Sequence, residues 1–302
     1  MQREYWFLIL AGIFYGTITP GGQFLMERGL SMFEVSFYRS LLVFLILLPV
    51  VLLRRRYVME RSKVAFYALY GLIGGLLELM MFSGIALGVP VAIVVLLLYT
   101  QPIWTVFIGR VMLGEKITFV KIASVILGLF GLVFLLGSWE AGSGGSYAGI
   151  LCSLASGVLL SFWVILGKRS AMLDQHYITT TFGWSGFAFV WLLILLPVTR
   201  IMVTDETLTG FSLDLSAPNF TYLIIFASLG GAIPHLLFYR ALEKITASVA
   251  GIVLLLEPVS ATILAWIFFS QSIGFYILLG GVFILISNYI VIRESRNETP
   301  VF

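Results

Sequence analysis

The chain has 302 residues, of which 60% are hydrophobic and only 11% are charged, and its formal net charge is +3. A soluble domain usually carries about 25% charged residues, so this composition and a mean hydropathy of +1.05 exclude an ordinary soluble protein. The sequence therefore predicts an integral membrane protein in a lipid bilayer. Its one cysteine, Cys152, excludes a disulfide framework and a thiolate metal site, and we expect neither a metal nor a cofactor.

Ten apolar stretches are long enough to cross a hydrocarbon core of about 30 Å as helices, which takes roughly 20 residues each. In chain order, the predicted spans are 5–25, 32–53, 64–85, 90–109, 117–137, 147–167, 177–199, 220–239, 246–269 and 273–292. Only Arg3 is a basic residue before the first span, and no small-residue cleavage site follows it. We therefore expect a membrane helix there and not a removed signal peptide.

Basic residues are distributed unevenly over the connections between these spans. If the N-terminus lies in the cytoplasm, the only basic residues in outer connections are Arg28 and Arg200. This bias follows the positive-inside rule, which predicts cytoplasmic N- and C-termini in the inner (plasma) membrane of the cell. The basic run at 54–56 is then a feature of membrane topology, and we expect no nucleic-acid partner.

Two stretches of the chain resemble each other. The stretch from Ala86, ALGVPVAIVVLLLYTQPIW, aligns with ALEKITASVAGIVLLLEPVS from Ala241 with one gap, and places Pro102 on Pro258. The fourth span thus corresponds to the ninth. We predict an all-α integral membrane fold of ten transmembrane helices in two inverted five-helix repeats. The repeats are 1–140 and 147–292, joined by a Gly/Ser-rich linker at 141–146 and followed by a cytoplasmic tail at 293–302. Because each repeat has an odd number of helices, the second enters the membrane from the opposite side, as in secondary transporters with a site near the midplane.

Several motifs carry a family resemblance. They are FYRSLL around Arg39, QP at 101–102 leading to LGEK, and the long motif ALEKITASVAGIVLLLEPVSATILAWIFF. The chain resembles a ten-helix permease of the drug/metabolite transporter superfamily, EamA type, over nearly its whole length. The resemblance implies a secondary-active permease that exports amino acids or other small metabolites. Two departures are FSQS at 269–272 in place of a second LGE, and Phe187 or a neighbour where the first repeat has Arg39.

Glu257 lies near the middle of the ninth span and directly precedes a proline. A charge at this depth costs at least about 2.5–3.5 kcal/mol unless it faces a cavity or a partner. Because proline has no N–H, Pro258 and Pro102 should kink their helices and free the carbonyls of Leu254 and Leu98. We expect Gln101 and Glu257 to face one central space, as parts of a substrate cavity or gate. The alternative is that both prolines are packing kinks and Glu257 is a protonated structural group.

Three further polar residues lie inside predicted spans. Glu78 and His235 fall within two positions of each other when the repeats are superposed, and Arg39 lies about a third of the way along the second span. Arg39 could pair with Glu78 or with Glu257, and His235 could titrate near neutral pH. The alternatives are a fixed ion pair and a hydrogen-bonded core histidine. The aromatic candidates for the cavity lining are Tyr99, Trp104, Trp163, Trp184 and Tyr239.

Two other classes of function remain open at this point. Ser185 in the seventh span and His235 in the eighth could form the dyad of an intramembrane serine hydrolase, although no local motif supports it. A passive channel is the other alternative. We favour a non-enzymatic secondary-active carrier that works by alternating access on a small-molecule substrate, with protons as a potential coupling ion. The sequence leaves monomer and homodimer open.

Overall fold

The computed structural model describes residues 3–89, 91–136, 146–269 and 274–295. The linker predicted at 141–146 lies outside this range except for Ser146, and so do FSQS from Ser270 onward and the tail from Arg296. In the described part, nine helical segments are long and apolar enough to cross a membrane, and a shorter apolar helix covers Phe119–Leu135. These segments match the ten predicted spans.

Several spans consist of two helices in sequence. The elements, in chain order, are α1 (Arg3–Tyr15), α2 (Ile18–Met26), α3 (Met32–Leu53), η1 (Arg55–Tyr57), η2 (Arg61–Lys63), α4 (Val64–Ala86), α5 (Val91–Leu98), α6 (Gln101–Leu113), α7 (Phe119–Leu136), α8 (Tyr147–Met172), α9 (Tyr177–Met202), α10 (Glu206–Thr209), α11 (Ala217–Ala227), η3 (Ser228–Ala232), α12 (Ile233–Leu242), α13 (Ala247–Val253), α14 (Leu256–Phe269) and α15 (Phe275–Ser295). The first, fourth, eighth and ninth spans are the divided ones.

Local sequence signals define several helix ends. Ser31 and Glu34 form a capping box at the start of α3, in which the Ser31 hydroxyl accepts from Glu34 N and the Glu34 carboxylate accepts from Ser31 N. Gly114 ends α6 in the left-handed conformation with φ of 71°, which glycine adopts without a steric penalty. Pro102 lies in the first turn of α6, where its missing N–H has no helical partner to lose.

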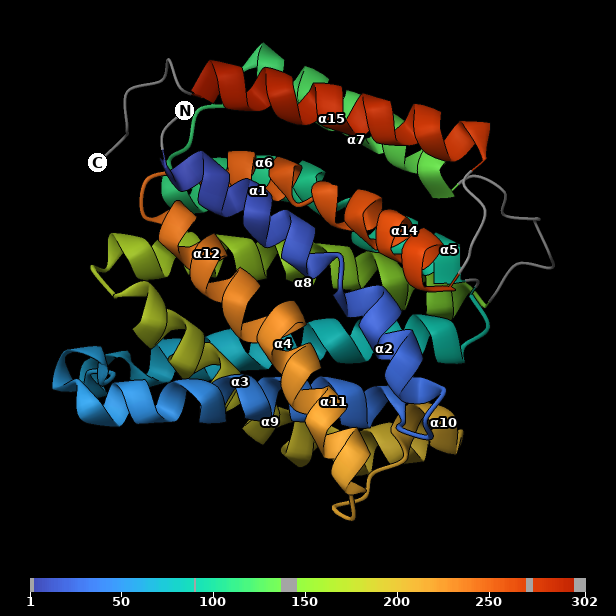
Figure 1. Cartoon of the computed structure of the whole chain (residues 1–302). Helices are drawn as coiled ribbons and strands as arrows, with labels where there is room; N and C mark the ends of the chain where they lie inside the picture. Colours follow the sequence, from blue (N-terminus) through green and yellow to red (C-terminus); the bar gives the residue numbers. More distant parts are fainter. Residues whose placement is uncertain (1–2, 90, 137–145, 270–273, 296–302) are drawn as a thin grey trace.

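Helix packing reflects the internal repeat (Figure 1). Three spans pack against their counterparts: α7 against α15, α3 against α9, and the fourth span against the ninth through α6 and α13. The contact of α4 with α8 has its equivalent in the contact of α12 with α1. These pairings are those expected of two five-helix repeats related by a pseudo-two-fold axis.

Small residues allow the paired helices to approach closely. A Cβ added to Gly131 of α7 would lie 2.7 Å from the Gly280 carbonyl oxygen of α15. In the same interface, the Ser287 hydroxyl donates to the Ser124 carbonyl at 2.6 Å. Such small residues are typical of helix contacts in membranes, where close backbone approach replaces the hydrophobic driving force.

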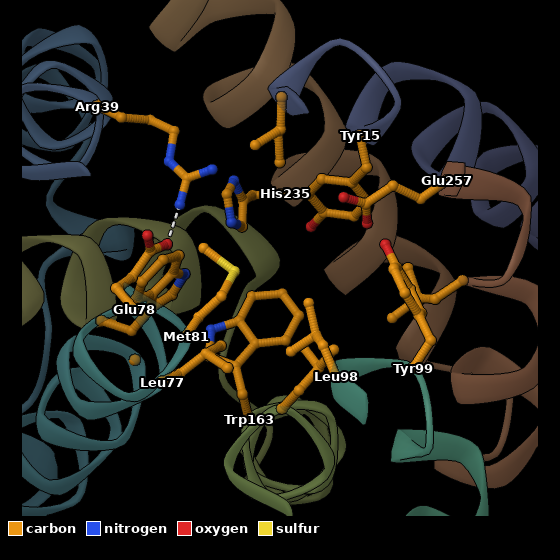
Figure 2. Close-up of a pocket in the computed structure, with 15 residues that line it drawn as sticks. Tyr15, Arg39, Leu77, Glu78, Met81, Leu98, Tyr99, Trp163, His235 and Glu257 are labelled. Atoms are coloured by element: carbon orange, nitrogen blue, oxygen red, sulfur yellow. Dashed lines mark hydrogen bonds and ion pairs between the residues drawn. The ribbon is translucent and has the colours of Figure 1, made fainter. Parts of the chain in front are cut away.

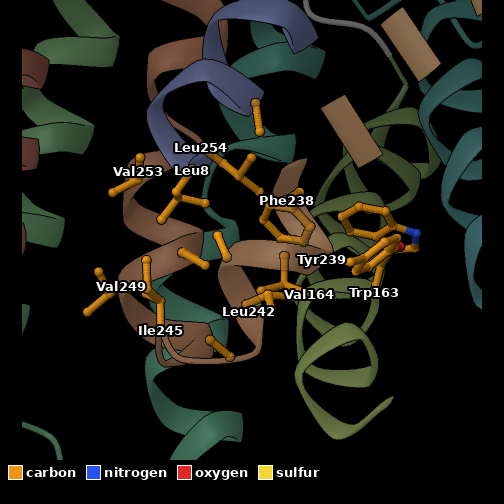
Figure 3. Packing of buried hydrophobic residues seen from close by; sticks show 14 of the residues in the cluster. Leu8, Trp163, Val164, Phe238, Tyr239, Leu242, Ile245, Val249, Val253 and Leu254 are labelled. Atoms are coloured by element: carbon orange, nitrogen blue, oxygen red, sulfur yellow. The ribbon is translucent and has the colours of Figure 1, made fainter. Parts of the chain in front are cut away.

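The start of α1 and the end of α15 lie on one side of the bundle, which we call the terminus side (Figure 1). There, the Tyr5 hydroxyl donates to Ser295 Oγ at 2.9 Å and Lys244 pairs with Glu4 at 2.5 Å. A buried apolar cluster, of which Tyr5 is also a member, adjoins these contacts. Figure 3 shows it built from α1, α8, α12 and α13, with Leu8, Val164, Leu242, Ile245, Val249 and Val253 among its members.

Candidate functional site

A cavity of about 120 Å³ lies within the bundle (Figure 2). Helices of both repeats contribute to its wall. It is lined by Tyr15, Ile18, Arg39, Gly74, Leu77, Glu78, Met81, Leu98, Tyr99, Leu160, Trp163, Trp184, His235, Leu254 and Glu257. The structure therefore brings six of the residues singled out as site candidates, Arg39, Glu78, Tyr99, Trp163, His235 and Glu257, to one cavity, together with Trp184.

An ion pair lies on one side of this cavity. Arg39 of α3 contacts Glu78 of α4, with side-chain exposures of only 11% and 17%. The Ser36 hydroxyl, one turn before Arg39, donates to the other carboxylate oxygen of Glu78 at 2.7 Å. Of the two partners that the sequence left open for Arg39, the structure thus selects Glu78. The pair carries no net charge, which limits its cost in a low-dielectric interior.

His235 is positioned by an irregular turn. The π-helical segment η3 directly precedes α12, and His235 Nδ1 contacts the carbonyl of Gly231 within that segment. Because a carbonyl can only accept, Nδ1 is the donor. A Cβ on Gly231 would lie 2.5 Å from Val43 Cγ2 and 3.6 Å from Arg39 Cγ, so glycine allows η3 to pack directly on α3. Single π-turns of this kind are frequent at functional sites.

Two broken helices meet the cavity. The fourth span is interrupted at Tyr99–Thr100, between α5 and α6, and the ninth at Leu254–Leu255, between α13 and α14. The prediction that Pro258 frees the Leu254 carbonyl is wrong, because Glu257 N donates to it at 2.9 Å in a tight turn. At the break, the Leu254 carbonyl thus accepts a hydrogen bond from the residue three positions later, whereas in a regular α-helix the donor lies four positions later.

A glycine from the other repeat covers each break. A Cβ added to Gly157 of α8 would lie 2.6 Å from the Leu97 carbonyl oxygen and 2.9 Å from that of Leu98. The corresponding contact is that of Gly12 of α1, where an added Cβ would lie 3.5 Å from the Val253 carbonyl oxygen. Carbonyls at the breaks are therefore packed against protein backbone, as is required at membrane depth.

Glu257 lies in the first turn of α14, where the positive end of the helix dipole favours a carboxylate. Figure 2 shows its carboxylate on the opposite side of the cavity from Arg39 and Glu78, with the Tyr99 hydroxyl pointing toward it. In the part of the chain that the structure describes, Glu257 forms no ion pair with a lysine or arginine.

Three of the predicted site residues lie outside the cavity lining: Gln101, Tyr239 and Trp104, whose indole N–H donates to Thr100 Oγ1 at 3.1 Å. Gln101 is fully buried, donates through Nε2 to Thr105 Oγ1, and contacts the backbone position of Gly251 in α13. The expectation that Gln101 shares one space with Glu257 is therefore not met. Tyr239 lies behind the wall, where its hydroxyl hydrogen-bonds that of Tyr70 at 2.7 Å and its ring packs on Trp163.

The cavity also has residues that sequence reasoning missed. The main one is Tyr15, which ends α1, is 4% exposed, and has no hydrogen-bond partner for its hydroxyl among the described residues. The indole N–H of Trp184, which is 7% exposed, also has no partner among them. Buried polar atoms are nearly always paired, so these two donors in one cavity wall are open to a ligand or to ordered water.

Polar contacts join the two repeats on the terminus side of the bundle. Glu115, which follows α6, accepts from Ala247 N at 2.5 Å and from Ser248 N at 2.9 Å, and also contacts Ser248 Oγ. It thereby caps the start of α13 in the other repeat. Lys168 Nζ donates to the Leu242 carbonyl at 2.8 Å close by. The Glu4–Lys244 pair is a second contact between the repeats on this side, whereas the bond from Lys168 to Leu242 lies within the second repeat.

The hydroxyl of Ser185 does not face His235. Ser185 Oγ donates to the Thr181 carbonyl of its own helix at 2.7 Å, as serines in transmembrane helices commonly do. His235 instead uses Nδ1 for Gly231, and its ring lies against those of Trp184 and Tyr15 at 4.9 Å and 5.3 Å between centroids. The two residues form no catalytic dyad in this conformation of the described chain.

Comparison with known proteins agrees with this architecture. The model of the EamA-like transporter family matches twice, over residues 2–137 and 147–293. The chain belongs to this family. The protein is a transmembrane transporter of the drug/metabolite transporter superfamily.

Alignments with related proteins cover nearly the whole chain. A protein named an uncharacterized transporter from Clostridium kluyveri is 27% identical and covers 99% of this chain and 95% of its own length. An uncharacterized transporter from Archaeoglobus fulgidus is 23% identical, with 95% of each chain covered. A protein of known crystal structure has the same fold, with a TM-score of 0.77, 16% identity, and coverage of 98% of this chain and 99% of its own.

Proposed function

We propose that the protein is a secondary-active carrier that exports small metabolites, such as amino acids or related compounds, by alternating access. In this proposal the cavity between the repeats is the substrate site. Glu257, Arg39, Glu78, His235, Tyr99 and Trp163 contact the substrate or a coupling ion, while Gln101 and Tyr239 support the wall. Pro102 and Pro258 hold the helix breaks. The observation that carries the proposal is one cavity lined by ionisable residues of both repeats, with polar contacts that join the repeats on the terminus side.

The geometry supports a small substrate. The cavity volume of about 120 Å³ is slightly below the roughly 150 Å³ of an engineered protein cavity that binds benzene. A larger substrate would require α13 and α14 to move away from α1. Because the breaks at 99–100 and 254–255 interrupt the helices beside the cavity, the segments on either side of each break can move separately.

We place the protein in the inner membrane of the cell. The distribution of basic residues then puts the terminus side on the cytoplasmic face of that membrane. The present conformation is then closed to the cytoplasm. Its opening would require the Glu115 cap on α13 and the Glu4–Lys244 pair to separate. The proposal applies equally to a monomer and to each protomer of a homodimer.

Purified protein in liposomes tests this function. We expect saturable uptake of a radiolabelled solute from an amino-acid and amine panel, accelerated when the same unlabelled solute is loaded inside. Counterflow of this kind requires a site that alternates between the two sides. Unsaturable flux would instead indicate a channel, and peptide hydrolysis without flux would indicate an enzyme; either result would contradict the proposal.

A further inference from the structure

The charges in the cavity wall do not balance. The described lining residues that carry full charges are Arg39, Glu78 and Glu257, and the first two neutralise each other as an ion pair. The carboxylate of Glu257 has no ion-pair partner among the described residues, so the cavity carries one net negative charge whenever Glu257 is ionised. An uncompensated charge in a low-dielectric interior is costly, so a bound ligand that brings one positive charge completes the site.

His235 does not supply that positive charge. Its Nδ1–H is engaged with the Gly231 carbonyl, and it forms no ion pair with a carboxylate in the described chain. Aromatic rings of Tyr15, Trp163 and Trp184 surround it with centroids 4.9–5.6 Å away. An imidazolium there would add a second cation close to Arg39 without a carboxylate of its own.

The wall around Glu257 suits an organic cation more than a hydrated metal ion. Tyr15, Tyr99, Trp163 and Trp184 all line the cavity and are at most 7% exposed. The faces of such rings attract ammonium groups, and the effect is stronger where water is excluded. A metal ion would need several oxygen ligands, whereas Glu257 is the one carboxylate of the described lining that is not held in an ion pair.

A second feature constrains the rest of the ligand. The Trp184 N–H can only donate, and it has no acceptor among the described residues. The Tyr15 hydroxyl is also unpaired among them. A ligand with a hydroxyl or carbonyl oxygen would satisfy such donors. A carboxylate could do so too, but a zwitterion brings no net charge and would leave the cavity negative.

We propose, on the basis of the carrier function above, that the substrate is a small organic monocation with a neutral hydrogen-bond acceptor, such as an amino alcohol or an amino amide. Glu257 binds its cationic group, the aromatic rings enclose it, and Trp184 and Tyr15 donate to its oxygen. Zwitterionic amino acids are therefore poorer ligands than their amide or alcohol analogues.

Three compounds of nearly the same shape test this proposal on the purified full-length protein. Choline carries a fixed positive charge and a hydroxyl, 3,3-dimethyl-1-butanol is its neutral analogue, and glycine betaine is the corresponding zwitterion. Ethanolamine provides a smaller cation. Binding is measured in detergent by calorimetry or by the rise in unfolding temperature, since a ligand that binds the folded state stabilises it.

We expect choline or ethanolamine to bind at least tenfold more tightly than the neutral and zwitterionic compounds. Glu257→Gln should weaken cation binding at least tenfold and leave the affinity for 3,3-dimethyl-1-butanol unchanged. Glu257→Asp should still bind the cation more tightly than the neutral compound. Trp184→Phe should weaken the binding of choline, which has a hydroxyl, more than the binding of tetramethylammonium, which has none. This last comparison separates loss of the N–H from general loss of the wall.

Equal binding of choline and betaine, or no binding of either cation to the folded protein, would overturn the inference. So would saturable counterflow of a neutral amino acid that is unchanged in Glu257→Gln, although the carrier function would then stand. Absence of saturable flux for every solute would remove the carrier function, and a cation that still bound in a Glu257-dependent way would leave the inferred site intact.

Discussion

Gln101 and Glu257 occupy equivalent positions in two broken helices, each directly before the proline of its repeat, yet only Glu257 lines the cavity. Gln101 instead donates to Thr105 and packs against Gly251 of the other repeat. The repeats therefore share a backbone plan and differ in the chemistry placed on it. Gln101 packs outside the cavity lining, whereas Glu257 places in the cavity a carboxylate that has no ion-pair partner among the described residues.

This difference predicts that Gln101→Glu mainly lowers stability, whereas Glu257→Gln mainly lowers transport. Gln101→Glu places a carboxylate at a fully buried position where the amide now donates to Thr105. We expect a loss of roughly 3–5 kcal/mol in unfolding free energy, as for an uncompensated buried charge. Glu257→Gln should change stability by no more than about 1 kcal/mol while impairing transport. Unfolding of both variants in the same detergent measures this, and equal stability losses would contradict it.

The Arg39–Glu78 pair should behave as one unit in a double-mutant cycle. Arg39→Met or Glu78→Leu alone leaves a partly buried charge without its partner, which should cost about 3 kcal/mol or more. The variant with Arg39→Met and Glu78→Leu should cost less than either single change, because it removes both charges. Thermal unfolding of the purified variants gives the coupling, and additive losses would show that the pair is not coupled.

The glycine at the fourth-span break should be sensitive to one added methyl group. Alanine at Gly157 would bring a Cβ to 2.6 Å from the Leu97 carbonyl oxygen, so α8 must shift away from the break. We expect a destabilisation of about 1–3 kcal/mol, typical of overpacking, despite the better helix propensity of alanine. Gly274→Ala is the matched control, since no heavy atom lies within 4 Å of its added Cβ. Equal stability of the two variants would argue against a close contact at Gly157.

Membrane orientation can be measured with single cysteines in a Cys152→Ser background. Leu213→Cys lies on an exposed loop position at the side opposite the terminus side, and Ser62→Cys lies at the terminus side. On whole cells, an impermeant maleimide should label the cysteine at position 213 and not the one at position 62, because the basic residues favour a cytoplasmic terminus side. The reverse labelling pattern would invert the proposed orientation and the direction in which the present conformation is closed.

The spans and the Arg39–Glu78 pair were within reach of sequence reasoning. Long apolar runs have few alternatives to membrane helices, and opposite charges inside them tend to find each other. The sequence could not predict that the Gln101 side chain lies outside the cavity. Gln101 has the same position in its repeat as Glu257, and only the contact with Gly251 distinguishes the two. Tyr15 carries no charge and stands in an ordinary apolar segment, so its place in the cavity depends on how α1 packs against α12 and α14.

The sequence also could not predict that Glu115 caps the start of α13. The motif LGEK was visible in the sequence, but the N–H groups that Glu115 binds belong to Ala247 and Ser248 in the second repeat. Local patterns identify a helix start and an acidic loop separately. Their contact follows from the packing of α6 against α13 of the other repeat, which only the three-dimensional arrangement provides.

The most direct test of alternating access is a reversible cross-link across the closed terminus side. A Cβ added to Gly109 of α6 would lie 3.5 Å from Ser248 Oγ of α13, close enough for a disulfide between cysteines at the two positions in a Cys152→Ser background. With the cross-link formed in proteoliposomes, we predict that counterflow falls to the level of empty liposomes and returns on reduction. The single-cysteine variants should transport under both conditions. Full counterflow by completely cross-linked protein would contradict the account, because the terminus side could then not open.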